Sequence, residues 1–173
     1  MTRSPLITTG RCWKFGDNLS SDELISAQHV FEYDPRMLRK HLLAEVRPEL
    51  ATTAKAGDVL VAGKRFAHGS QHSHPFIAMK DIGLGLIART LTRPPYRLAV
   101  YMGVPLLEIG EASWQALNDG DELRVDYAQG LIDNLTTGAH AETDPLPGFL
   151  LDIVASGGGL GFLREQNESA GVT

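Results

Sequence analysis

The chain has 173 residues, of which 43% are apolar and 21% charged, and its formal net charge is −5. This length and composition are typical of a soluble chain with one buried core, so we expect a single domain over residues 1–173. The acidic balance argues against non-specific nucleic-acid binding. No apolar run approaches the roughly 20 residues of a membrane helix, and Met1–Gly10 lacks the pattern of a secretory signal. We therefore expect a cytoplasmic protein with no membrane partner.

Cys12 is the chain's single cysteine. One thiol cannot form an internal disulfide, and it cannot hold an iron–sulfur cluster by itself. Its neighbours alternate between apolar and polar, which favours a small core residue over a nucleophile. We expect this chain to carry no cofactor of its own.

The first half of the chain begins with a strand over residues 10–15, followed by a turn at residues 16–18. Asp34-Pro35 is typical of a helix start, with Asp as the N-cap and Pro at the first helical position. Apolar residues on one helical face predict a helix that continues to about residue 46 and is ended by Pro48.

In the middle of the chain, short apolar runs alternate with segments that begin at proline and end at glycine. The runs predict buried strands over residues 58–62, 84–88 and 104–109, and the segments between them predict helices over residues 75–82 and 94–102. Strands and helices in this alternation indicate an α/β fold, with a mostly parallel sheet and crossover helices.

The last part of the chain predicts a turn at residues 118–120 and a β-hairpin over residues 122–127 and 131–135. A last short helix follows over residues 146–155. Gly157–Gly159 then predicts a flexible loop, and a polar tail runs from about residue 165 to 173.

The segment most able to carry chemistry is residues 67–74, Ala-His-Gly-Ser-Gln-His-Ser-His, between a predicted buried strand and a helix. The free N–H groups and positive dipole end of that helix favour a carboxylate there. Gly69 allows a close turn of the backbone against a ligand, and Ser70 adds a hydroxyl beside it.

Three histidines crowd this loop, at positions 68, 72 and 74. Imidazole is a common zinc ligand, but this spacing is not one of the strong zinc signatures, and we predict no metal here. The alternatives are that one histidine caps the helix while another is solvated, or that one acts as an acid or base near neutral pH.

Several basic side chains are candidates for contact with an anionic substrate. They are Lys64, Arg65, Arg89, Arg93 and Arg97. Arg93 and Arg97 flank Pro94-Pro95-Tyr96 at the end of a predicted strand, where ligands of parallel sheets usually bind, and arginine suits a two-pronged grip on carboxylate. For each arginine the alternative is simple surface solvation.

The order and spacing of motifs along nearly the whole chain resemble the small subunit of isopropylmalate isomerase, a member of the aconitase superfamily. The matching segments are Gly10–Asn18 with Ser21-Asp22, Gly57–Gly63, Phe66–Ser70, Arg93 with Tyr96-Arg97 and Ala99, Gly103 with Pro105–Leu107, Gly120–Leu123 and Gly158–Leu160.

The resemblance implies the swivelling β/β/α domain of aconitase type. It also implies a partner, an iron–sulfur large subunit that carries a [4Fe-4S] cluster. Together the two subunits of this family dehydrate and rehydrate 2-hydroxy acids such as 3-isopropylmalate. The cluster acts as a Lewis acid, and the small subunit contributes a serine base beside an arginine that binds carboxylate.

The family loop reads Gly-Ser-Ser-Arg-Glu-His, whereas this chain has Gly-Ser-Gln-His-Ser-His at residues 69–74. By this match Ser70 is the catalytic base, and Asp22 matches an active-site aspartate. Gly69, Gln71 and His72 would then contact the substrate. Histidine in place of arginine is shorter and not reliably charged at pH 7, so the usual carboxylate grip is altered.

In this family, the segment after Asp22 determines which substrate is accepted. Where members that use tricarboxylates have an arginine, this chain has His29-Val30-Phe31, so Val30 and Phe31 are predicted to meet an apolar substituent. Leu98 stands where the family has Asn, which removes a polar group. We predict a hydro-lyase subunit for a substituted malate. The alternatives are a non-catalytic or divergent paralogue and a metal enzyme using the three loop histidines.

Overall fold

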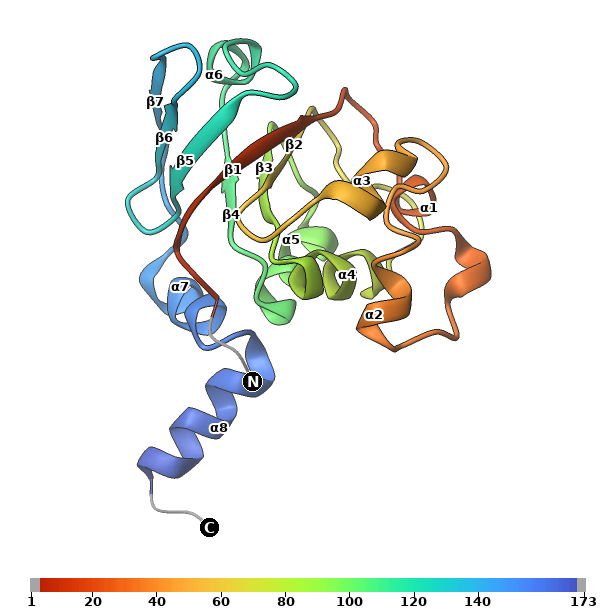
Figure 1. Cartoon of the computed structure of the whole chain (residues 1–173). Coiled ribbons are helices and arrows are strands. Elements are labelled where there is room, and N and C mark those ends of the chain that lie inside the picture. Colours follow the sequence, from red (N-terminus) through yellow and green to blue (C-terminus); the bar gives the residue numbers. More distant parts are fainter. Residues whose placement is uncertain (1–3, 171–173) are drawn as a thin grey trace.

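A seven-stranded curled sheet organises the computed structural model, which describes residues 4–170 (Figure 1). The strand order is β4-β3-β2-β1-β5-β6-β7. The strands are β1 (Ile7–Lys14), β2 (Val59–Ala62), β3 (Gly85–Ala88), β4 (Leu106–Glu108), β5 (Glu122–Asp126), β6 (Leu131–Asn134) and β7 (His140–Glu142).

Strand β1 joins two halves of different pairing. On one side, β1, β2, β3 and β4 run parallel, as the alternation of strands and helices predicted. On the other side, β1 pairs antiparallel with β5, and β5 pairs with β6 in the predicted hairpin. The predicted α/β class is confirmed, and β7 adds a strand that the sequence analysis did not expect.

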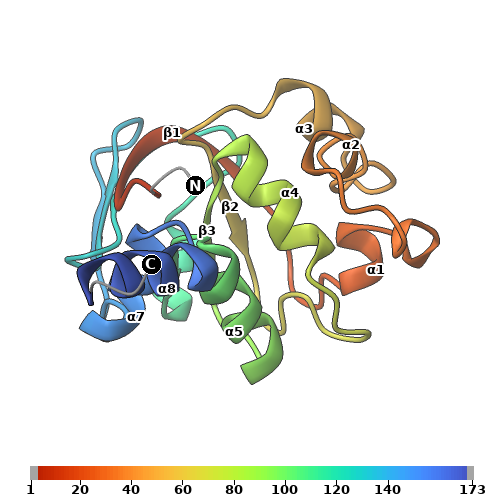
Figure 2. The same ribbon diagram turned by 90° about the horizontal axis from the view of Figure 1, so that it is seen from below.

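The helices and helical turns follow in chain order. They are α1 (Ser21–Leu24), η1 (Ala27–His29), α2 (Pro35–Leu38), α3 (Pro48–Thr53), α4 (His74–Ile82), α5 (Arg93–Met102), α6 (Glu111–Gln115), α7 (Gly148–Ala155) and α8 (Gly159–Ser169). The crossover helices α4 and α5 lie side by side over one face of the parallel strands (Figure 2). In the described part of the chain, no helix has the length and apolar character needed to cross a membrane.

Strands β2 and β3 are buried on both faces at every residue, which explains their continuous apolar runs. Leu60 and Leu86 point into a core shared with the helices, whereas Val59, Val61 and Ile87 point into a second core. The antiparallel half supplies the other side of that second core, and Figure 1 shows it curling over the sheet.

The predicted long helix over residues 35–46 is wrong. Helix α2 ends at Leu38, although Asp34 caps it as expected, and Pro48 begins α3 rather than ending a helix. Leu43 adopts a positive φ of 56° and donates its N–H to the Leu24 carbonyl at 2.7 Å. This tertiary hydrogen bond redirects the chain. Of the predicted apolar face, Leu38 and Leu42 are buried, whereas Met37 and Val46 are exposed.

Two predictions at the end of the chain also differ from the structure. Helix α7 is not the last one, because α8 begins directly at Gly159, inside the predicted flexible glycine loop. Residues 165–169 of the predicted polar tail are helical. Residues 1–3, part of the segment judged not to be a signal, and residues 171–173 of the tail lie outside the described residues.

Candidate functional site

The loop between β2 and α4, residues 63–73 (the site loop), is held by the segment that follows β1. Asn18 donates its N–H to Lys64 O, and Ser21 donates to His68 O, each at 2.8 Å. Ala67 in turn donates to Leu19 O at 2.8 Å. These backbone bonds continue the parallel pairing of β1 and β2 beyond their carboxyl ends, and they bring α1 against the site loop.

Helix α1 carries Asp22 in its first turn. A capping box fixes this helix: Glu23 N donates to Ser20 Oγ at 3.1 Å, and Ser20 N donates to Glu23 Oε2 at 2.7 Å. The Ser-x-x-Glu pattern at residues 20–23 is a known start signal that the sequence analysis missed. Asp22 itself is exposed at this edge of the sheet.

Ser70, the predicted base, is exposed in the site loop. Gly69 precedes it with a φ of 102°, a conformation that a side chain would strain, and a Cβ there would lie 3.4 Å from Ser21 Oγ. Within residues 4–170, the Ser70 hydroxyl makes no side-chain hydrogen bond, so it is available to a ligand.

Gln71 folds back on its own loop. Its amide Nε2 donates to Gly69 O at 2.8 Å and to Ala67 O at 3.2 Å. The side chain thus braces the turn that presents Ser70, and its predicted role in substrate binding stays a prediction.

His72 and His74 form a pair at the start of α4, with their Nδ1 atoms 3.2 Å apart. The Tyr33 ring lies 5.0 Å from the His74 ring, and both Nε2 atoms are buried with no hydrogen-bond partner among the described residues. Burial lowers the pKa of His72, neighbouring His74 lowers it further, and only the Asp22 carboxylate opposes this. His72 is therefore a neutral hydrogen-bonding group at pH 7, unlike the arginine of the family loop.

The third loop histidine does not join this pair. His68 Nε2 lies 3.0 Å from the Asn18 carbonyl oxygen, on the β1 side of the loop. In the part of the chain that the structure describes, no three His, Cys, Asp or Glu side chains are grouped to hold a metal ion. The geometry thus gives the metal hypothesis no support.

Val30 and Phe31, the predicted contacts for an apolar substituent, lie on the loop between α1 and α2, residues 25–34 (the 25–34 loop). Phe31 is 93% exposed. Two ring contacts attach this loop to the body: His29 stacks on His41 at 3.7 Å between centroids, and Tyr33 packs on His74. The sequence analysis missed Tyr33 and His41, because no short-range pattern links them to the site.

Arg93 and Arg97 lie on α5, at the same carboxyl edge of the sheet but further along it. Both line a cavity of about 660 Å³ between α5 and α7, and no residue of the site loop lines that cavity. Their predicted role toward the reacting substrate stays a prediction.

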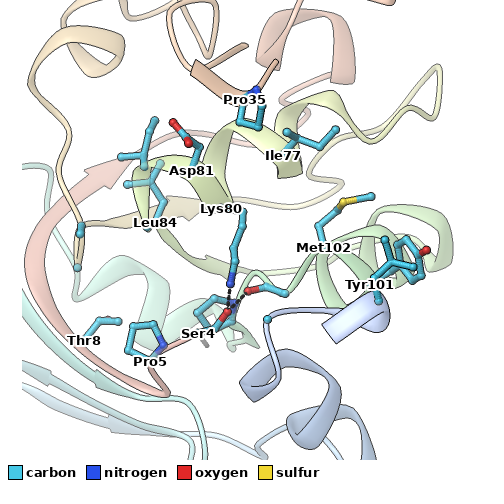
Figure 3. A pocket seen from close by; sticks show the side chains of 18 residues that line it. Ser4, Pro5, Thr8, Pro35, Ile77, Lys80, Asp81, Leu84, Tyr101 and Met102 are labelled. Atoms are coloured by element: carbon cyan, nitrogen blue, oxygen red, sulfur yellow. Dashed lines mark hydrogen bonds between the residues drawn. The ribbon is translucent and has the colours of Figure 1, made fainter. Parts of the chain in front are cut away.

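A second groove, of about 580 Å³, lies at the opposite edge, where the parallel strands begin (Figure 3). Lys80 points into it and donates to Ser4 Oγ, which donates in turn to Gly103 O at 2.6 Å. Because the length of the parallel strands separates it from Ser70, this groove is not part of the candidate site.

Cys12 lies on β1, and it is fully buried in the second core. Burial, with smaller contributions from Asp119 and Asp121, raises the pKa of its thiol to about 12. A buried protonated thiol is neither a nucleophile nor a cluster ligand, so the residues of this chain do not fit an iron–sulfur cluster.

No family model matches the chain. Curated relatives nevertheless match almost all of it. The 3-isopropylmalate dehydratase small subunit of Nautilia profundicola is 37% identical and covers 92% of this chain and 96% of its own length. Small subunit 1 of Archaeoglobus fulgidus is 39% identical over 93% of this chain and 99% of its own. This chain belongs to the 3-isopropylmalate dehydratase small-subunit family.

The fold agrees with this membership. The crystal structure of the 3-isopropylmalate dehydratase LeuD from Methanocaldococcus jannaschii superposes with a TM-score of 0.88, at 28% identity, over 95% of this chain and 98% of that one. The family resemblance predicted from the motifs is confirmed, and so is the swivelling-domain fold class that it implied.

Proposed function

We propose that this chain is the small subunit of a hydro-lyase that dehydrates and rehydrates a substituted malate of the 3-isopropylmalate type, as in leucine biosynthesis. The observation that carries the proposal is the backbone hydrogen bonding that holds the site loop against α1. It sets the free Ser70 hydroxyl and the Asp22 carboxylate on one exposed edge, in a family whose members are named for this reaction.

In this proposal Ser70 takes the proton from the substrate carbon next to the hydroxyl-bearing carbon, and returns it in the hydration direction. Gly69 lets the backbone approach the substrate, and the Gln71 brace holds the turn in position. A carboxylate of the substrate lies near the N-terminus of α4, where backbone N–H groups favour an anion. His72 brings no guanidinium to this carboxylate, because its Nδ1 faces His74 and its Nε2 is buried, so the contact predicted for it stays a prediction.

The reaction also needs a group that activates the hydroxyl for departure. The chain's own residues do not supply one, so we assign a [4Fe-4S] cluster to the partner large subunit implied by the relatives' names. When bound there, the cluster provides a Lewis acid for the hydroxyl and a carboxylate of the substrate. The exposed site edge, with Phe31 beside it, is the surface that would face that subunit.

A divergent paralogue for a different 2-hydroxy acid is the second candidate. The observation that favours it is that Gln71 and His72, which replace Ser and Arg, bond within the loop and to His74. A substrate with a smaller or less acidic distal group suits this neutral lining better than one with an extra carboxylate.

The test is reconstitution of the full chain with its large subunit under anaerobic conditions, followed by an ultraviolet assay for the new carbon–carbon double bond. The full chain alone should be inactive, and the complex should convert 3-isopropylmalate or a methyl-substituted malate. Ser70→Ala should lower kcat by about 10²-fold or more, the scale of general-base catalysis.

Ser113→Ala is the matched control, because Ser113 lies on α6, outside the site loop and α1. It should leave kcat and KM unchanged. Full activity of the isolated chain would contradict the two-subunit proposal. An unchanged kcat for Ser70→Ala in an active complex would contradict the assignment of Ser70 and favour a non-catalytic role for this subunit.

A further inference from the structure

The cavity between α5 and α7 has a polar end and an apolar end. Near the ends of β3 and β4 it is bounded by Arg93 and Glu108. Val100, Leu150 and Ile153 form an apolar wall of the same cavity. Its volume of about 660 Å³ falls within the range typical of small-molecule sites.

The arginines on this cavity lack partners. Arg93 and Arg97 are one helical turn apart on α5 and line the same cavity, so their like charges repel each other. Among the described residues, neither guanidinium has a carboxylate within ion-pair distance, whereas Arg47 and Arg89 both do. Two unpaired guanidinium groups beside an apolar cavity are suited to a carboxylate ligand.

Glu108 adds the opposite charge at the same end. Its Oε1 accepts the backbone N–H of Leu91 at 2.9 Å, which fixes the carboxylate at the cavity mouth. Its second oxygen makes no hydrogen bond or ion pair in residues 4–170, so it is available to a cationic donor. The negative charge of Glu108 also helps to raise the pKa of Tyr96, although burial is the larger cause.

We propose that this cavity binds a free α-amino acid with a branched apolar side chain. The ligand carboxylate lies between Arg93 and Arg97, its ammonium donates to Glu108, and its side chain packs on Val100, Leu150 and Ile153. This ligand matches all three features, because a simple anion would leave Glu108 unused and a simple amine would leave both arginines unpaired. The proposal goes beyond the hydro-lyase function and gives the two arginines a ligand of their own.

Isothermal titration calorimetry on the full chain tests the proposal, and it does not depend on enzymatic activity. The probes are L-leucine, 4-methylpentanoate, which lacks the ammonium, and 3-methylbutylamine, which lacks the carboxylate. L-leucine should bind saturably, and each of the other two at least about tenfold more weakly, since each loses one charge-assisted interaction.

Single variants test the contacts to each end of the ligand separately. Arg97→Gln should weaken L-leucine binding about tenfold or more. Glu108→Gln keeps an acceptor for Leu91 and should bring L-leucine down to the affinity of 4-methylpentanoate. Ile153→Trp fills the cavity and should abolish binding. Arg124→Gln, on the β5–β6 hairpin where Arg124 pairs with Asp133, is the control and should bind as the parent does.

Circular dichroism melts establish that each variant is folded before it is titrated. The proposal is overturned if L-leucine shows no saturable binding up to about 10 mM. It is equally overturned if 4-methylpentanoate binds as tightly as L-leucine to the parent chain, or if folded Ile153→Trp binds as the parent does.

Discussion

His72 and His74 are joined through their Nδ1 atoms, 3.2 Å apart, at the start of α4. Only one of these nitrogens can carry the hydrogen, so the two rings must adopt complementary tautomers. One Nε2 is then a donor and the other an acceptor. Because both Nε2 atoms are buried, the pair fills the position where relatives of this family are expected to present a cation.

Stability should decrease on the acid side of neutrality. Burial lowers the folded-state pKa of His72, and burial together with His29 lowers that of His41. Below pH about 6.5 the unfolded chain takes up protons that the folded chain resists, so the free energy of unfolding falls as pH drops towards the folded-state pKa values. Urea unfolding from pH 7.5 to 5 measures the slope.

The matched variant for this slope is the double substitution His41→Gln with His72→Gln, which should flatten it. A single His140→Gln substitution should leave the slope steep, because His140 is an exposed residue paired with Asp133. A double variant with the slope of the parent would show that other groups control the acid sensitivity.

Loss of the His74 ring should destabilise the site loop. His74→Phe removes the partner of His72 Nδ1 and leaves that half-buried nitrogen unsatisfied, which should cost about 1–3 kcal/mol of unfolding free energy. Urea unfolding at pH 7.5 measures the cost. His140→Ala, at the surface, should stay within about 0.5 kcal/mol of the parent, and equal costs for the two variants would argue against the pairing.

Asp58 should be a structural residue of the family motif rather than a catalytic one. It is 1% exposed, and its carboxylate accepts the N–H groups of Arg11, Lys55 and the Trp13 indole at 2.9, 3.2 and 3.0 Å. Asp58→Ala leaves these donors without a partner and should cost about 3–5 kcal/mol. Asp58→Asn keeps one acceptor oxygen and should cost less. A cost below about 1 kcal/mol for the alanine variant would refute this role.

The stack of His29 on His41 should control the substrate affinity of the reconstituted complex. His29→Ala removes a contact worth about 1 kcal/mol and releases the 25–34 loop that carries Val30 and Phe31. We expect KM to rise about fivefold with little change in kcat. Limited proteolysis within residues 25–34 should accelerate in parallel. Gln129→Ala, at an exposed position between β5 and β6, is the control, and a fall in kcat with unchanged KM would contradict the positioning role.

Prediction from sequence succeeded where local patterns and burial agree. The apolar runs at β2 and β3 are continuous because those strands are buried on both faces, and the αL glycines at 83 and 103 end α4 and α5 as their positions indicated. The helix predicted over residues 35–46 failed because the Leu43–Leu24 hydrogen bond, between segments far apart in sequence, overrides its helical periodicity.

The sequence by itself determined the family, the parallel core, the position of the site loop and the Ser70 hydroxyl within it. All of these depend on short-range patterns or on motif order. Only the tertiary structure decided which groups meet: Asp22 beside the site loop, Tyr33 on His74, and Arg93 and Arg97 along a separate cavity with Glu108. Such contacts depend on how strand ends and loops converge in space, and residue spacing along the chain carries no record of that convergence.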